Sequence, residues 1–277
     1  MSELLTARDA IARIPGWDPN NVAIEELHGG LSNRTFKVTH RDTDFVLRLD
    51  ATHTGAFQLN RGLEAAINRN AATAGLAPQV VFADPAAGIL LSEYLHGKIW
   101  SRLSFDDYRN LDALAESLRR VHALPLCGVL LNVKAVAGFY AGKLPSAEGS
   151  YAFARRCEEI IAGMPESGRV CCCHNDVIAQ NIIATPKLKL LDWEYACDND
   201  PLFDLASVVA YHDLDQALAD ALLDAYAGGA DGELRERLSE QIRIYDAIHW
   251  LWLANRQMLS HDRGLSKRLE DLQRRIS

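Results

Sequence analysis

The chain has 277 residues, of which 48% are hydrophobic and 24% charged, a composition typical of globular proteins and unlike disordered, collagenous or coiled-coil chains. Its formal charge of −8 at pH 7 argues against binding to nucleic acid, which requires a basic surface. The longest stretch without Asp, Glu, Lys or Arg, 70–83, is too short to span a bilayer, and the charged N-terminus does not resemble a signal peptide. We therefore expect a cytoplasmic protein without membrane insertion, whose partners are small neutral or cationic molecules.

The first third of the chain predicts a sheet with one long helix. Thr6 and Asp9 form a capping-box pattern before a short helix that ends near Ile14. Alternating hydrophobic residues predict five strands, over 22–27, 35–38, 45–49, 79–83 and 89–95. The apolar spacing over 57–74 predicts a helix, and Gly75 follows it where a left-handed residue commonly ends a helix.

Beyond residue 97 the apolar residues recur at helical spacing. They predict amphipathic helices over 105–124, 151–162, 201–211, 214–227 and 234–260, interrupted by a strand-and-loop insert over 170–198. We expect an α+β fold with a small antiparallel-sheet lobe over 1–92, a hinge over 93–97 and a larger helical lobe over 98–277. A ligand is expected in a cleft at the hinge.

The most informative motif is His174-Asn175-Asp176, with Asn181 after four intervening residues and Asp192 at the end of the next apolar strand. Phosphoryl transfer from ATP to an alcohol needs a carboxylate that orients and deprotonates the hydroxyl, and oxygen ligands that hold Mg²⁺ against the phosphates. Asp176, Asn181 and Asp192 supply such groups, on a loop and the ribbon that follows it. The alternative is that they are turn residues, and His174 is best explained as a core residue that supports the loop.

These residues resemble the choline/ethanolamine kinase family with its bacterial thiamine kinase-like relatives, and more remotely the aminoglycoside phosphotransferases. The resemblance covers most of the chain and is strongest over 191–196, LDWEYA, and 199–206. It implies a protein-kinase-like bilobal fold, with a nucleotide-binding first lobe and a catalytic, acceptor-binding second lobe. It also implies ATP as co-substrate, Mg²⁺ as cofactor, Asp176 as the catalytic base, and Asn181 and Asp192 as the metal ligands.

The candidate ATP-binding residues are Gly30, Ser32, Asn33, Arg48, Glu64, Glu93, Tyr94 and Leu95. The glycine-rich loop resembles one that closes over nucleotide phosphates, although a plain hairpin turn is the alternative. A charge at Arg48, in a largely buried strand, requires a partner, and Glu64 on the following helix is the candidate. The resemblance implies that this pair holds the phosphates, with a surface ion pair as the alternative, and that the backbone at 93–95 meets adenine.

The candidate acceptor-binding residues are Glu194, Tyr211, Tyr245, His249 and Trp252. Tyr245, His249 and Trp252 share one face of a predicted helix, and aromatic faces bind quaternary ammonium groups through cation–π attraction. The stretch 190–234 contains eleven acidic residues and no Lys or Arg, which also favours a cationic substrate. The alternative for the aromatic stripe is helix-packing core, and Glu194 could reach either metal or substrate.

The run Cys171-Cys172-Cys173-His174 invites comparison with a zinc site. Adjacent ligands cannot all turn to one tetrahedral ion, and no second Cys/His pair lies nearby in the sequence, so we expect buried, reduced thiols.

The sequence therefore predicts an ATP-dependent phosphotransferase that acts on the hydroxyl of a small cationic alcohol. Choline is the first candidate, and thiamine and ethanolamine are next. An aminoglycoside O-phosphotransferase also fits the pattern. A nucleotide-binding pseudokinase is favoured least, because it would be expected to lack a catalytic or metal residue. Neither the oligomeric state nor the choice between ATP and GTP follows from these patterns.

Overall fold

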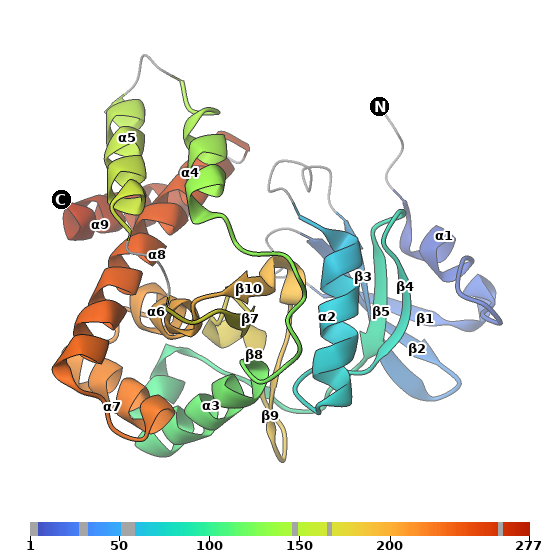
Figure 1. The fold of residues 1–277 in the computed structure, drawn as a ribbon. Helices are drawn as coiled ribbons and strands as arrows, with labels where there is room; N and C mark the ends of the chain where they lie inside the picture. Colours follow the sequence, from blue (N-terminus) through green and yellow to red (C-terminus); the bar gives the residue numbers. More distant parts are fainter. Residues whose placement is uncertain (1–4, 28–32, 51–58, 146–148, 165–167, 260–262) are drawn as a thin grey trace. The chain divides into compact units, whose positions relative to one another are not determined.

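The computed structural model describes residues 5–27, 33–50, 59–145, 149–164, 168–259 and 263–277. The chain has an α+β fold made of two compact units, one comprising Met1–Ser101 and Gln180–Ala196, the other Arg102–Ala179 and Cys197–Ser277 (Figure 1). This division differs from the predicted one, which placed 180–196 in the second lobe and the boundary at 93–97.

The first unit is built on a five-stranded antiparallel sheet, as predicted, and its strands lie in the order β1-β2-β3-β5-β4, which was not predicted. Its elements up to residue 101 are α1 (Ala7–Ile11), β1 (Ala23–Leu27), β2 (Asn33–His40), β3 (Thr43–Asp50), α2 (Arg61–Thr73), β4 (Val80–Asp84), β5 (Ile89–Glu93) and β6 (Lys98–Ile99). Thr6 and Asp9 form the expected capping box of α1, and Gly75 takes the expected left-handed conformation (φ 74°) after α2.

The alternation of β3 decides which face of the sheet each side chain meets. Leu47 and Leu49 point into an apolar core that they share with Ile11 of α1. Arg48, between them, points to the opposite face, where it meets Glu64 of α2. The alternation of the strand thus places this charge on the face of the sheet that meets α2.

The segment Gln180–Ala196 belongs to the first unit because its strands pair there. Strands β8 (Ile182–Ala184) and β9 (Leu188–Leu190) form the expected ribbon, and β8 also pairs with β6, giving a three-stranded sheet in the order β6-β8-β9. Leu190 N–H donates to the carbonyl of Leu76 (2.7 Å), which ties the ribbon to the end of α2. These backbone pairings between distant segments leave no local signal in the sequence.

The second unit is mainly helical, with one two-stranded ladder. Its elements are α3 (Tyr108–Val121), α4 (Val133–Ala141), α5 (Gly149–Ala162), β7 (Cys171–Cys173), β10 (Cys197–Asn199), α6 (Pro201–Tyr211), α7 (Gln216–Ala227), α8 (Gly232–Leu259) and α9 (Arg263–Ile276). The long helix α8 packs against α4, α5, α6 and α9 (Figure 1). Among the helices that the structure describes, none is long and apolar enough to cross a membrane.

Helices α4 and α9 were not predicted. Helix α4 is short and apolar around most of its circumference, so it lacks a clear amphipathic period, although Asn132 caps it by accepting from the Ala135 N–H (2.9 Å). Helix α9 is highly charged, and its narrow apolar stripe consists of Leu265, Leu269, Leu272 and Ile276.

Candidate functional site

The ribbon of the first unit brings Asn181 and Asp192 to the same end. Asn181 directly precedes β8, and Asp192 follows β9 after one intervening residue, Leu191. The two strands are in register, with Ile182 opposite Leu190, and the Leu191 N–H donates to the Asn181 carbonyl (2.8 Å). Asp192 has a left-handed backbone (φ 59°), which non-glycine residues rarely adopt and which is often found at functional sites.

Asp192 lies beside the ion pair of Arg48 and Glu64. Arg48 binds both carboxylate oxygens of Glu64, and its Nη1 lies 3.5 Å from Oδ1 of Asp192. Burial by itself would lower the pKa of Arg48, but the hydrogen bond to Glu64 and the nearby acids raise it above its usual value. The Asp192 side chain is 37% exposed, whereas that of Glu64 is 2% exposed. The expected pair therefore forms inside the unit, with a more accessible carboxylate next to it.

A second guanidinium, that of Arg61, organises the same face. Its Nη1 lies 2.9 Å from Glu64 and 3.0 Å from Glu194, its Nε lies 2.7 Å from Asp50, and its Nη2 donates to Asn33 Oδ1 (2.7 Å). Asn33 Nδ2 also donates to Glu194 (2.8 Å), whose side chain is only 3% exposed. The carboxylate of Glu194 is thus bound by Arg61 and Asn33, an arrangement that positions the loop carrying Asp192.

The other residues expected near ATP are only partly described. Gly30 and Ser32 lie outside the described residues. At the end of β5, the Glu93 N–H donates to the Gln79 carbonyl (2.9 Å) and the Tyr94 N–H to the Asp44 carbonyl (3.2 Å). These two donors are therefore used within the sheet and are not directed to a ligand.

In the second unit, Asp204 of α6 holds the start of the loop that carries Asp176. It accepts the backbone N–H groups of His174 (2.9 Å) and Asn175 (2.6 Å), and Nε2 of His122 lies 3.0 Å away. Burial opposes ionisation of Asp204, but the bonds from His122 and His174 lower its pKa below the usual value. Asp204 therefore remains a buried carboxylate that fixes the loop backbone, which agrees with the structural role expected for His174.

Two further residues of the α6 region bind the rest of this loop. Ser207 Oγ accepts the Val177 N–H (3.2 Å), and Nε2 of His212 accepts the Ala179 N–H (3.0 Å). Burial, with the charges of nearby arginines, lowers the pKa of His212 to about 4, which keeps its ring neutral and able to accept. The loop is thus anchored along its length from one helix.

Asp176 lies close enough to two tyrosines to affect their ionisation. Burial raises the pKa of both Tyr211 and Tyr245, and the negative charge of Asp176 raises both further. Asp176 itself is half-buried, whereas Tyr245 is 6% exposed. The second unit therefore places the candidate base beside two members of the aromatic group predicted to bind the acceptor.

The aromatic stripe of α8 is more closed than an open cation cage. His249 stacks on Tyr211 (ring centroids 5.5 Å apart) and contacts Trp252 (6.3 Å). The guanidinium of Arg268 lies 5.5 Å from the centre of the Tyr211 ring, and that of Arg256 lies 5.4 Å from the centre of Trp252. Burial, with Arg268 and Arg275 nearby, lowers the pKa of His249 to about 3. Two rings of this group thus already have a cation of the protein beside them.

Two residues of α8 next to this stripe are buried. Trp250 turns away and packs edge-on against Phe153 of α5, and it is 1% exposed. Asp246 is buried on α8 and pairs with Arg275, and burial raises its pKa to about 6.

Several residues of the site were missed by reasoning from the sequence. Arg61 had a weak signal, its position three residues before Glu64 on one helix, but nothing indicated its contacts with Asp50 and Glu194. Arg268 belongs to the unpredicted helix α9, and its guanidinium donates to the Tyr211 carbonyl (2.6 Å). Such contacts depend on how distant segments pack.

The donor set at the ribbon fits the metal that the resemblance implies. Mg²⁺ prefers hard oxygen ligands such as carboxylate and amide oxygens, and Asp192 and Asn181 offer one of each at the same ribbon end. The residues present therefore suit the ion.

The sequence of the chain is similar to those of known phosphotransferases. Residues 23–240 match the phosphotransferase enzyme family (APH). A thiamine kinase of Salmonella typhi is 33% identical over 248 residues, covering 87% of this chain and 83% of that protein. Protein LicA of Haemophilus influenzae is 28% identical over 209 residues, covering 72% of this chain, and the match spans 61% of that protein's length.

A solved structure shows the same fold over nearly the whole chain. The choline/ethanolamine kinase family protein of Mesorhizobium loti is 26% identical, with a TM-score of 0.75, covering 98% of this chain and 92% of that one. Residues 23–240, which match the family, contain the strands of the five-stranded sheet, the loop with Asp176 and the ribbon with Asp192. The chain therefore belongs to the phosphotransferase enzyme family, in its branch of kinases related to choline/ethanolamine kinase and thiamine kinase, which have the protein-kinase-like fold.

Proposed function

We propose that this protein transfers the γ-phosphoryl group of ATP, with Mg²⁺, to the hydroxyl group of a small cationic alcohol. The observation that supports this most strongly is the placement of Asp192 beside the bidentate pair of Arg48 and Glu64. A guanidinium that can bind phosphate oxygens and a carboxylate that can bind a metal are the two groups that hold a nucleoside triphosphate in this fold.

In this proposal, Arg48 binds phosphate oxygens of ATP while Glu64 fixes the direction of its guanidinium. Asn181 and Asp192 hold Mg²⁺, which neutralises charge on the phosphates when bound. Arg61 and Asn33 bind Glu194 and so position the loop of Asp192, and we assign Glu194 no direct contact with the acceptor. Because the N–H groups of Glu93 and Tyr94 are used in the sheet, we assign adenine recognition to the Glu93 carbonyl and the Leu95 backbone.

Asp176 is the proposed catalytic base. The acceptor oxygen attacks the γ-phosphorus, the bond to the bridging oxygen of ADP breaks, and the hydroxyl proton passes to the Asp176 carboxylate. Asp204, Ser207 and His212 hold the backbone on both sides of Asp176, so the carboxylate needs little reorganisation during the reaction.

Choline is the first candidate acceptor, since Tyr211, Tyr245, His249 and Trp252 form an aromatic group near Asp176. Thiamine is a second candidate for a specific reason. Guanidinium groups already lie beside the rings of Tyr211 and Trp252, so a quaternary ammonium would have to displace them, whereas the flat, neutral aminopyrimidine ring of thiamine can stack on a guanidinium. The identity to the thiamine kinase, 33% over 87% of this chain, also supports it.

A coupled assay of ADP release with choline, ethanolamine, thiamine and kanamycin, each with and without Mg²⁺, tests the proposal. We expect Mg²⁺-dependent ADP release that requires choline or thiamine, with kcat/KM at least about tenfold higher for one of them than for kanamycin. ADP release that is independent of any acceptor, or highest with kanamycin, would contradict the proposed substrate class.

A further inference from the structure

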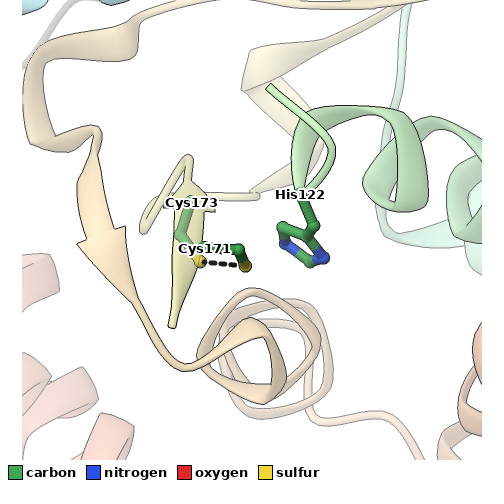
Figure 2. Close-up of side chains that lie close together, drawn as sticks. All are labelled: His122, Cys171 and Cys173. Atoms are coloured by element: carbon green, nitrogen blue, oxygen red, sulfur yellow. Dashed lines mark hydrogen bonds between the residues drawn. The ribbon is translucent and has the colours of Figure 1, made fainter. Parts of the chain in front are cut away.

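Outside the kinase site, the second unit contains a cluster of metal-binding side chains. His122, at the end of α3, lies beside Cys171 and Cys173 of β7 (Figure 2). One ring nitrogen and the two sulfur atoms all lie within 4.8 Å of one another, and the three residues are buried. Sequence reasoning dismissed zinc here because adjacent cysteines cannot share one ion, but strand alternation removes that objection. Cys171 and Cys173 are on one face and Cys172 is on the other.

The distances suit a tetrahedral ion. The two sulfur atoms are 3.6 Å apart and share a hydrogen bond. In a tetrahedral zinc site with Zn–S bonds of about 2.3 Å, the two sulfur atoms are separated by about 3.8 Å. The thiols therefore already lie near the separation that a bound ion would impose, and little rearrangement of β7 is needed.

The surroundings of His122 resemble those of a metal-bound histidine. Its Nε2 lies 3.0 Å from Asp204 Oδ2, and its Nδ1 lies 2.8 Å from the hydroxyl of Tyr226 on α7. A carboxylate that accepts from one ring nitrogen fixes the tautomer and leaves the lone pair of the other nitrogen for a metal. The hydroxyl of Tyr226, 2.8 Å from Nδ1, is placed to supply the fourth ligand.

We propose that His122 Nδ1 and the sulfur atoms of Cys171 and Cys173 form a binding site for one thiophilic ion, Zn²⁺ in the first instance, with the Tyr226 hydroxyl in the fourth position. Two thiolates balance the charge of the ion, and two sulfurs with one imidazole are a donor set that selects zinc over Mg²⁺. Through Asp204, the site is joined to the backbone of His174 and Asn175, so the ion would stabilise the loop that carries Asp176. This proposal stands independently of the acceptor of the kinase.

Cobalt substitution tests the site directly, because thiolate-bound Co²⁺ shows charge-transfer absorption that oxygen-bound Co²⁺ lacks. The full chain is purified under reducing conditions, treated with a chelator and titrated with Co²⁺ in the presence of excess Mg²⁺. We expect one equivalent of Co²⁺ with thiolate charge-transfer bands, and displacement by Zn²⁺. At a hundredfold excess of Zn²⁺ over its Kd, the melting temperature should rise by roughly 5 °C or more.

Cys172→Ser is the matched control, because Cys172 is equally buried on the same strand but faces the other way. Cys171→Ser and Cys173→Ser should abolish the charge-transfer bands, and Cys172→Ser should retain them. Far-UV circular dichroism establishes that each variant is folded. If Cys173→Ser does not fold, Cys171→Ser and the spectrum of the wild-type protein decide the matter.

Two results would overturn the proposal. One is a wild-type protein that binds Co²⁺ without thiolate bands, or whose bands persist in Cys171→Ser. The other is an intramolecular disulfide between Cys171 and Cys173 in a second preparation, purified without reductant and with oxygen excluded; it is seen as a mass loss that a reductant reverses and would assign the pair to redox chemistry.

Discussion

Asp192 combines a rare backbone conformation with a specific electrostatic setting. Its φ of 59° lies in the left-handed region, two residues after the end of β9. Its carboxylate lies 3.5 Å from Arg48, and its side chain is 37% exposed. A carboxylate that served only as a partner of Arg48 would be expected to be buried with it, as Glu64 is. The partial exposure of this side chain is consistent with the proposed binding of a cation.

Replacing Asp192 with Ala should therefore remove Mg²⁺-dependent binding of ATP. The negative charge of the Asp192 carboxylate is the protein charge that neutralises the ion, because Asn181 offers only a neutral oxygen. Calorimetric titration with ATP, with and without Mg²⁺, measures the effect, and Asp112→Ala, which removes an exposed carboxylate of α3, is the control. An unchanged affinity for ATP in the presence of Mg²⁺ would show that Asp192 is not a ligand.

At the scale of elements, α6 acts as the support of the loop that carries Asp176. Asp204 and Ser207, and His212 at its C-terminal cap, accept backbone N–H groups along that loop. The contact of His212 requires a neutral ring, and burial lowers its pKa to about 4 from an ordinary value near 6.5. Its contribution to stability is thus fully present above about pH 6.5 and is lost as the pH falls toward 4.

Stability should accordingly fall between pH 7 and pH 5 by on the order of 1 kcal/mol through His212 alone. His212→Gln keeps an acceptor near the Nε2 position but does not titrate, so its melting temperature should depend less on pH over this range. Asp246, with a pKa raised to about 6, makes stability change with pH in the opposite direction, but it is present in both the wild-type protein and His212→Gln. His96→Gln, at an exposed position, is the control and should retain the wild-type slope. If the melting temperature of His212→Gln depends on pH as strongly as that of the wild-type protein, His212 is not the group responsible.

The aromatic stripe of α8 can be either acceptor site or core, and Trp252→Ala distinguishes these. If Trp252 lines the acceptor site, KM for the cationic alcohol should rise about tenfold or more, while KM for ATP changes little. A purely structural tryptophan would lower the melting temperature without a selective effect on either substrate. Trp250→Ala is the control for the structural case, because Trp250 is 1% exposed and packs on Phe153. Reduced stability with an unchanged acceptor KM in Trp252→Ala would rule out the cage.

Elements with a regular local pattern were predicted well. The strands of the first sheet alternate clearly, and α6 has the predicted bounds, Pro201–Tyr211, because Asp200 caps it and Pro201 begins it. The ribbon that carries Asn181 and Asp192 also has the predicted form. Helices α4 and α9 were missed because one lacks a period and the other is dominated by charge.

At the scale of the whole molecule, the limit of prediction lies in contacts between distant segments. The pairing of β8 with β6 assigns Gln180–Ala196 to the first unit, and no residue in that segment signals this partner. The same holds for the approach of His122 to Cys171 and Cys173, and for the guanidinium of Arg268 beside Tyr211. In contrast, the pair of Arg48 and Glu64 was predictable because a buried charge requires an opposite charge.

The central claim is that the protein transfers phosphate from ATP to an alcohol with Asp176 as the base. The most direct test compares the wild-type protein with Asp176→Asn by ³¹P NMR, with ATP, Mg²⁺ and either choline or thiamine. We predict a phosphomonoester resonance of the acceptor with the wild-type protein, and kcat lower by a factor of about 10² to 10⁴ in Asp176→Asn, with ATP affinity nearly unchanged. No phosphomonoester with either acceptor, or more than half of the wild-type turnover in a folded Asp176→Asn variant, would contradict the claim.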